Sequence, residues 1–160
     1  MTQTLTVKEV QAYIQRNAFL PHENVGSGNI ILSMNGASPE DDSFVYFGGK
    51  CQFDMCANIE LGKYVYLATA ILFTHKHIFT GTDILLKRDW ESLENTKVFP
   101  KVICDDVWIL HATVQAECDY IAKGVVIGNG SIVTCPIEES YSIWAGIPAR
   151  RIGSRHADLC

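Results

Sequence analysis

Apolar residues recur every six positions along much of this chain of 160 residues. In its first half, two interleaved series show this spacing, namely Phe47, Phe53, Ile59, Val65 and Ile71, and Met55, Leu61, Leu67 and Phe73. A helix would show spacings of three and four, and a single half-buried strand would simply alternate, so a period of six fits neither element. The pattern is typical of short strands joined by tight corners and stacked into a parallel β-solenoid.

The second half continues the same phase. Its inward positions are Ile103, Ile109, Ile121, Ile127 and Val133, and polar Gln115 interrupts the series. The residues after these positions are mostly small, such as Ala122 and Gly128, which suits a corner where a larger side chain would crowd the bend or need an unfavourable φ. Bulky Leu110 departs from this rule, which predicts that the coil bends differently there because a residue has been lost near Ala112 and regained near Cys118.

Two segments fall outside the repeat. Near the amino terminus, apolar residues on one helical face after a capping-box spacing predict a short amphipathic helix over about residues 7–16. Residues 74–100 show no period of six and contain Gly81, Pro100 and several charges, which predicts a loop projecting from the solenoid. Long loops on such scaffolds often carry function.

These boundaries predict one repeat domain with two short flanking segments. The β-helical domain covers residues 43–153, an amino-terminal helix and irregular segment covers 1–42, and a tail covers 154–160. The fold class expected from the pattern is therefore an all-β solenoid.

Composition narrows the class of function. The formal net charge of -5 argues against a nucleic-acid groove or an anionic membrane surface, since both require clustered lysine and arginine. No apolar run is long enough to cross a membrane and the amino terminus lacks the features of a signal peptide, so we expect a cytoplasmic protein. The six cysteines include no CxxC pair and no zinc-finger spacing, so we expect free thiols and no metal site.

The carboxyl half carries the most specific motifs, KVICDDVWILHATV and, at the end of the repeat, SIWAGIPARRI. Together they resemble the hexapeptide-repeat acyltransferases, whose members include sugar, maltose, serine and xenobiotic acetyltransferases. The resemblance covers roughly residues 55–153. It implies a left-handed parallel β-helix, assembly as a homotrimer, and acetyl-CoA as co-substrate.

A second match to this family lies at the start of the projecting loop. Phe73-Thr74-His75-Lys76-His77 resembles the family's Thr-His-x-His element, in which a histidine is the catalytic base. By register His77 is the better match and His75 its neighbour. Histidine suits this role because its unperturbed pKa of about 6.5 lies near working pH. The resemblance thus implies direct attack on the acetyl carbonyl, with a backbone N–H steadying the oxyanion.

Coenzyme A needs cations for its phosphates and an extended backbone edge for its pantetheine arm. The resemblance supplies five candidates: Ala145, Gly146, Arg150, Arg151 and Lys123. The backbone of the first two would meet the arm, and the arginines would lie near the phosphates. Because the family's sites lie between adjacent subunits, His77 of one chain would face the closing coil of the next.

The resulting prediction is an acetyl-CoA-dependent acetyltransferase acting on a hydroxyl or amino group of a saccharide. N-acetylation of a nucleotide-linked amino sugar is the close alternative, since both acceptors need the same base. A metal-dependent carbonic anhydrase on a similar solenoid would need three histidines, such as His75, His77 and His111, and would leave the basic ending unexplained. A non-catalytic assembly subunit would keep the repeat without the histidine motif.

Overall fold

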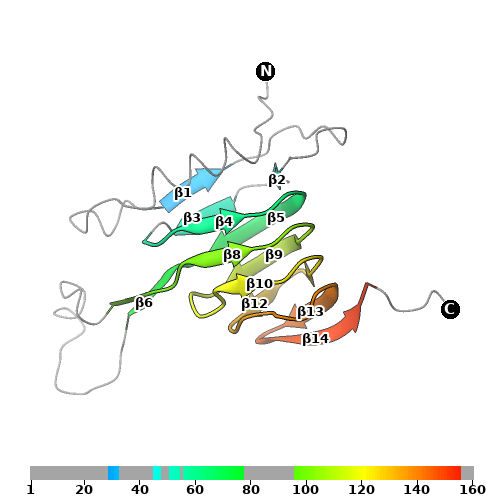
Figure 1. Cartoon of the computed structure of the whole chain (residues 1–160). Helices are drawn as coiled ribbons and strands as arrows, with labels where there is room; N and C mark the ends of the chain where they lie inside the picture. The colour runs from blue at the N-terminus through cyan, green and yellow to red at the C-terminus, as the bar shows by residue number, and fades with distance from the viewer. Residues whose placement is uncertain (1–28, 33–44, 48–50, 55, 78–95, 156–160) are drawn as a thin grey trace, which may run out of the picture.

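The computed structural model describes residues 29–32, 45–47, 51–54, 56–77 and 96–155, and every regular element within them is a strand (Figure 1). The strands are β1 (Asn29–Leu32), β2 (Val45–Phe47), β3 (Cys51–Asp54), β4 (Ile59–Leu61), β5 (Val65–Leu72), β6 (His75–His77), β7 (Thr96–Val98), β8 (Lys101–Ile103), β9 (Trp108–Val114), β10 (Tyr120–Ile121), β11 (Val126–Ile127), β12 (Ser131–Val133), β13 (Ser142–Gly146) and β14 (Ala149–Ser154). The predicted all-β class is confirmed for these residues. The helix predicted over 7–16 lies outside them.

The strands pair in three parallel ladders, which the chain visits in turn. The first ladder runs β2, β5, β9, β11, β13. The second runs β3, β5, β9, β12, because β5 and β9 are long enough to take part in both. The third runs β4, β8, β10 and ends on a bridge between Ile121 and Ile137. Figure 1 shows the strands stacked one above another along a common direction.

The core lies between the ladders. Each strand places alternate side chains inward, and the fully buried members include Phe53, Ile59, Leu67, Leu72, Ile103, Ile109, Ile121 and Ile127. Burying one such side chain contributes about 2 kcal/mol, so this apolar column is the main source of stability. The apolar residues that recur every six positions in the sequence are the residues that form this core.

Two of the predicted inward positions are wrong by one residue. Ile71 and Phe73 are only half-buried, whereas Ala70 and Leu72 are fully buried. The reason is that β5 passes from the first ladder to the second with one residue fewer than a full hexad. Leu67 and Leu72, five apart, are both inward, so Leu72 takes the place expected of Phe73.

The same shortening occurs in β9 and explains the interruption at Gln115. Ile109 and Val114 are five residues apart, yet they pair with Ile127 and Val133, which are six apart. Val114 is therefore the inward residue, and Gln115 stands just past it. The altered bend predicted at Leu110 is confirmed by this register.

The corners between the third and first ladders each contain a residue with a positive, left-handed φ. Tyr64, Asp106, Gly124 and Tyr141 have φ of 58°, 58°, 73° and 58°. The first three stand three residues after the inward residues of β4, β8 and β10, so the left-handed φ falls two residues later than the sequence suggested. Crowding does act at the expected position in one coil, since a Cβ on Gly62 would lie 2.5 Å from the Asp105 side chain.

The two ends of the stack are covered by antiparallel strands. β1 pairs with β3 at the amino-terminal end, and β14 folds back on β13 at the carboxyl-terminal end. The five cysteines within the described residues are free thiols. None of the described residues forms a helix of the length and apolarity needed to span a membrane.

Candidate active site

The predicted loop over 74–100 begins and ends as a two-stranded ribbon. β6 follows β5 directly and pairs antiparallel with β7, so that His75 lies opposite Val98 and His77 opposite Thr96. The amide of Phe99 also donates to the Thr74 carbonyl at 2.7 Å. The two histidines thus stand on regular backbone at the base of the projection, and residues 78–95 lie outside the described part of the chain.

A buried carboxylate anchors this ribbon. Asp54 ends β3 and is 4% exposed, and its Oδ2 accepts hydrogen bonds from His75 Nδ1 at 2.5 Å and from the amides of Thr74 and His75 at 2.9 and 3.1 Å. The Thr74 hydroxyl donates to the Asp54 carbonyl at 2.8 Å and accepts from the Ala57 amide at 3.0 Å. Because these groups are buried and mutually satisfied, they fix where β6 leaves the ladder.

The Asp54–His75 contact sets the charge of both groups. Burial alone would raise the pKa of Asp54, but the hydrogen bonds from His75 and Thr74 outweigh it and lower the pKa to about 2. The hydrogen bond to Asp54 is the main reason that the pKa of His75 rises to about 10. At neutral pH the pair is therefore a carboxylate and an imidazolium, and His75 holds a proton on each ring nitrogen.

This pair predicts a pH window for stability. The pKa of His75 is raised above 6.5, so its stabilisation is complete below pH 6.5 and is lost as the pH rises to about 10. The pKa of Asp54 is lowered from 3.8, so its stabilisation is present above pH 3.8 and is lost as the pH falls to about 2. Denaturant unfolding should show the excess stability of the native chain over His75→Gln shrinking from pH 6.5 to 10. A constant difference would contradict the ion pair.

His77 and His75 are brought together, as the motif predicted. Their rings meet edge to face, with centroids 5.2 Å apart and an interplanar angle of 90°. His77 Nδ1 lies 3.3 Å from the Thr96 hydroxyl on β7. Between them, Lys76 forms an ion pair with Glu117, which tethers the ribbon to the turn after β9. His111 does not join this group. It pairs with Thr69 where β5 and β9 enter the second ladder, whereas the ribbon begins after β5 leaves that ladder.

The candidate coenzyme residues gather on the β13–β14 hairpin, with one exception. Ala145 pairs with Arg150 and Gly146 with Ala149, and Gly146 has a φ of 101° that favours glycine. Arg151 is held by Glu139, with its Nε 2.7 Å from Oε2. The exception is Lys123, whose carbonyl accepts from the Tyr141 amide at the opposite end of β13.

Among the described residues, the strand that leads into the histidine ribbon and the hairpin that carries the candidate coenzyme residues lie apart along the stack. In the first ladder β5 and β13 are separated by β9 and β11. Three steps of about 4.8 Å place them roughly 14 Å apart along the stack. Figure 1 shows β6 projecting at one side of the stack, with β13 and β14 at the carboxyl-terminal end of the stack.

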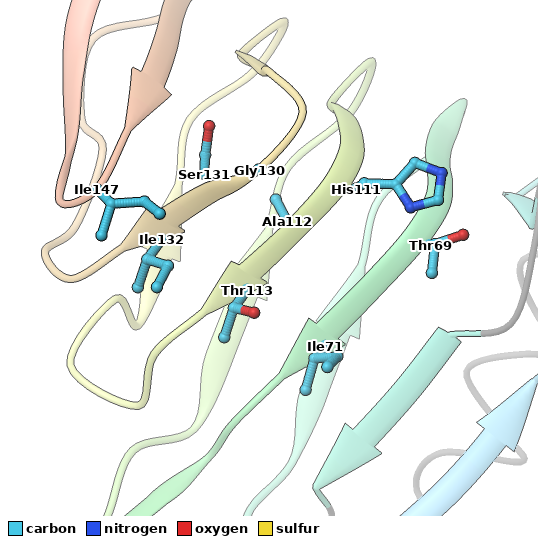
Figure 2. Close-up of a pocket in the computed structure, with 9 residues that line it drawn as sticks. All are labelled: Thr69, Ile71, His111, Ala112, Thr113, Gly130, Ser131, Ile132 and Ile147. Carbon is cyan, nitrogen blue, oxygen red and sulfur yellow. The ribbon is translucent and has the colours of Figure 1, made fainter.

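An open groove of about 310 Å³ crosses the outer face of the second ladder. Outward side chains of adjacent strands form its floor, since Thr113 pairs with Ile71 on one side and Ile132 on the other. His111 lies at one edge, and Ile147, from the turn that follows Gly146, lies at the other (Figure 2). The groove therefore leads from the candidate coenzyme hairpin across the stack.

Two residues of the histidine cluster were not singled out from the sequence. Asp54 at the end of β3 and Cys56 in the turn after it lie beside His75, although they stand about twenty residues earlier in the chain. One available signal was Asp54 itself, a carboxylate standing between two apolar positions, Phe53 and Met55, of the repeat. A charged residue in such a strand requires a buried partner.

No protein-family model matches this chain, and a search of curated proteins finds no match. Solved structures are similar. A hexapeptide-repeat-containing acetyltransferase from Vibrio cholerae, complexed with acetyl coenzyme A, is 25% identical, with a TM-score of 0.53 over 64% of this chain and 52% of that one. A mutant of AntD, an N-acyltransferase from Bacillus cereus, complexed with dTDP-4-amino-4,6-dideoxyglucose and coenzyme A, is 20% identical, with a TM-score of 0.52 over 72% and 60%.

This chain spans about half the length of the Vibrio cholerae protein. The similarity to hexapeptide-repeat acyltransferases inferred from the sequence motifs is confirmed by these structures.

Proposed function

We propose that this protein is an acetyl-CoA-dependent acetyltransferase that modifies a hydroxyl or amino group of a saccharide. The observation that carries the proposal is the pair of histidines on a ribbon anchored by a buried carboxylate. The similarity to an acetyltransferase complexed with acetyl coenzyme A supports the choice of co-substrate. The scaffold in this proposal is a left-handed parallel β-helix, which the three parallel ladders support.

In this mechanism His77 is the general base. A base must carry a lone pair at working pH, and Asp54 keeps His75 in its imidazolium form. We assign the Nδ1 proton of His77 to the contact with the Thr96 hydroxyl, so that Nε2 is the basic atom. Nε2 takes the proton of the acceptor as the acceptor attacks the acetyl carbonyl, and a backbone N–H steadies the oxyanion. The C–S bond then breaks, and the protonated His77 gives its proton to the leaving thiolate, so that coenzyme A departs as its thiol.

His75 is a positioning residue in this scheme. Its ring packs edge to face against His77, and its own orientation is fixed by Asp54. A base held within a few tenths of an ångström of its working position contributes far more than a mobile one. Asp54 therefore acts on catalysis through two rings and contacts neither reactant.

The β13–β14 hairpin and the adjoining groove are assigned to coenzyme A. The backbone of Ala145 and Gly146 would meet the pantetheine arm, and the apolar floor of the groove would continue its path from Ile147. Arg150 has no carboxylate within ion-pair distance among the described residues, so its charge can serve a phosphate. Lys123 is the weakest of the five candidates because it stands at the far end of β13.

The separation of the two clusters supports a site shared between chains in a homotrimer. One chain would supply His77 and its neighbour the closing hairpin. Trp108 is 46% exposed and packs edge to face against Tyr66, with ring centroids 5.2 Å apart, so it offers an aromatic surface for such a contact. The active species in this proposal is therefore an oligomer.

The two arginines should differ in their effect on coenzyme binding. Arg150→Gln is expected to raise the Kd for coenzyme A about tenfold, because a charge-assisted hydrogen bond to phosphate is lost. Arg151→Gln should have a smaller effect, since Glu139 already holds that guanidinium. Calorimetric titration of both variants measures this, and a larger effect for Arg151→Gln would reverse the assignment.

The proposal is tested by thiol release from acetyl-CoA across a panel of sugars and nucleotide-linked amino sugars. Turnover of any panel member supports it, and the acceptor that reacts separates O-acetylation from N-acetylation of a nucleotide-linked amino sugar. If nothing turns over and coenzyme A does not bind, the alternative of a non-catalytic assembly subunit takes its place.

A further inference from the structure

Three side chains with different donor atoms meet beside the histidine ribbon. An oxygen of Asp54, the sulfur of Cys56 and a ring nitrogen of His75 all lie within 4.8 Å of one another. Cys56 is brought there by its own backbone, since its amide donates to Asp54 Oδ1 at 3.3 Å, and its sulfur lies within 4.8 Å of the His75 ring nitrogen. The proposed acetyl transfer gives Cys56 no task.

The structure assigns a second property to this cluster: we infer that Asp54, Cys56 and His75 form a binding site for a divalent zinc-type cation. Sulfur, imidazole nitrogen and carboxylate oxygen are the three donor types that zinc uses in proteins. Magnesium and calcium prefer oxygen alone, so the thiol and the imidazole select against them.

The geometry is close to that of a tetrahedral site. Bonds of about 2.0 Å to nitrogen and oxygen and about 2.3 Å to sulfur would place the three donor atoms roughly 3.3–3.6 Å apart. The present Asp54–His75 distance of 2.5 Å would have to open by about 1 Å, and the Cys56 sulfur already lies within 4.8 Å of both partners. Side-chain rotations of this size need no change in the ladders.

Hydrogen bonds from the backbone hold the Asp54 carboxylate in place within this cluster. Asp54 is held on its strand by amide hydrogen bonds from Thr74, His75 and Cys56, which orient the carboxylate whether or not the imidazole bonds to it. Groups that orient metal ligands in this way raise metal affinity. Three protein ligands leave one position of a tetrahedral ion for water or another small ligand, so the bound ion should be exchangeable.

The sequence predicted no metal site because no cysteine or histidine spacing signalled one. The three ligands are split between β3 and its following turn and the start of β6, about twenty residues later in the chain. Parallel pairing of β3 with β5 brings these two points together.

Zinc binding is measured by competition with a chromogenic chelator. The protein is the full chain without an affinity tag, and a phosphine reductant is present to keep its thiols reduced. We expect one zinc per chain for the native protein and for the control Cys135→Ser, a half-buried thiol outside the cluster. Cys56→Ser should bind zinc at least about 100-fold more weakly, more than is lost when only a supporting residue is removed.

Cobalt(II) provides a readout that does not depend on the variants. Cobalt bound to the native chain should show the near-ultraviolet charge-transfer band of a cobalt–thiolate bond, and zinc should displace it. Absence of zinc binding by the native chain, or equal binding by Cys56→Ser, would overturn the inference.

The site itself does not depend on the proposed acetyl transfer, and the binding measurements need no substrate. One further experiment, inhibition of turnover by zinc, does rest on the proposed function. Because a metal ion would take both Asp54 and His75 out of their contact, zinc should inhibit turnover of the native protein while Cys56→Ser resists it. If zinc binds but no turnover exists to inhibit, the acetyltransferase proposal fails and the metal site stands.

Discussion

Replacement of His77 by alanine is expected to lower the turnover number by about 10²–10⁴-fold, the usual contribution of a positioned general base. The loss should fall on kcat more than on KM, because proton removal occurs only in the transition state.

The matched control is His75→Gln, which removes the neighbouring ring but leaves the base. Its turnover should fall by roughly tenfold through loss of positioning, while KM changes little. The two variants differ in position by two residues on one strand and should not differ in coenzyme affinity. Abolished turnover in His75→Gln together with near-native activity in His77→Ala would exchange the two roles.

The second large effect concerns stability. Lys101 opens β8 and is fully buried, and its ammonium donates to the carbonyls of Gln115 at 3.1 Å, Ala116 at 3.4 Å and Cys118. Burial lowers the pKa of this lysine, and the three carbonyls replace the water that a charged ammonium would otherwise hold. The side chain thus fixes the turn that follows β9.

Lys101→Met is expected to lower the free energy of unfolding by about 3 kcal/mol. Methionine has similar length but no donor, so the carbonyls of Ala116 and Cys118 lose this donor, while that of Gln115 keeps the Cys118 amide. Each buried carbonyl left unsatisfied costs about 1–3 kcal/mol. Lys97→Met on exposed β7 provides the same substitution without burial and should change stability by less than about 0.5 kcal/mol. Urea unfolding of both variants measures the difference.

Equal stability of Lys101→Met and the native chain would show that the cost of burying the ammonium offsets its hydrogen bonds. The turn also carries Glu117, which pairs with Lys76 between the two histidines. A loosened turn should therefore reduce turnover as well, and thermal unfolding separates this effect from the direct loss of a reacting group.

The period of six determined the strand class and most of the core in advance. Phe53, Ile59, Leu67, Ile109 and Ile127 are fully buried as predicted, because an inward position recurs wherever the chain completes the same strand and corner. The errors at Ile71 and Phe73 arose where β5 rounds a corner with one residue fewer. The hexad spacing in the sequence does not show how many residues form each corner. That number is known only from the register of the paired strands.

The candidate site divides in the same way. The motif at residues 73–77 was sufficient to select both histidines because they are local in sequence and stand on one strand. The motif did not predict whether each histidine ring is charged. That depends on Asp54, which lies twenty-one positions before His75 and reaches it only through the parallel pairing of β3 with β5.

By itself the sequence determined the repeat, the short strands, the histidine pair and the basic closing segment, since each is encoded in neighbouring residues or a fixed period. The tertiary structure decided which histidine is held as an imidazolium, which thiol joins it, and that Lys101 is buried against the turn after β9. The physical reason is that electrostatic and metal-binding properties depend on distances of a few ångströms between side chains that only the stacking of strands brings together.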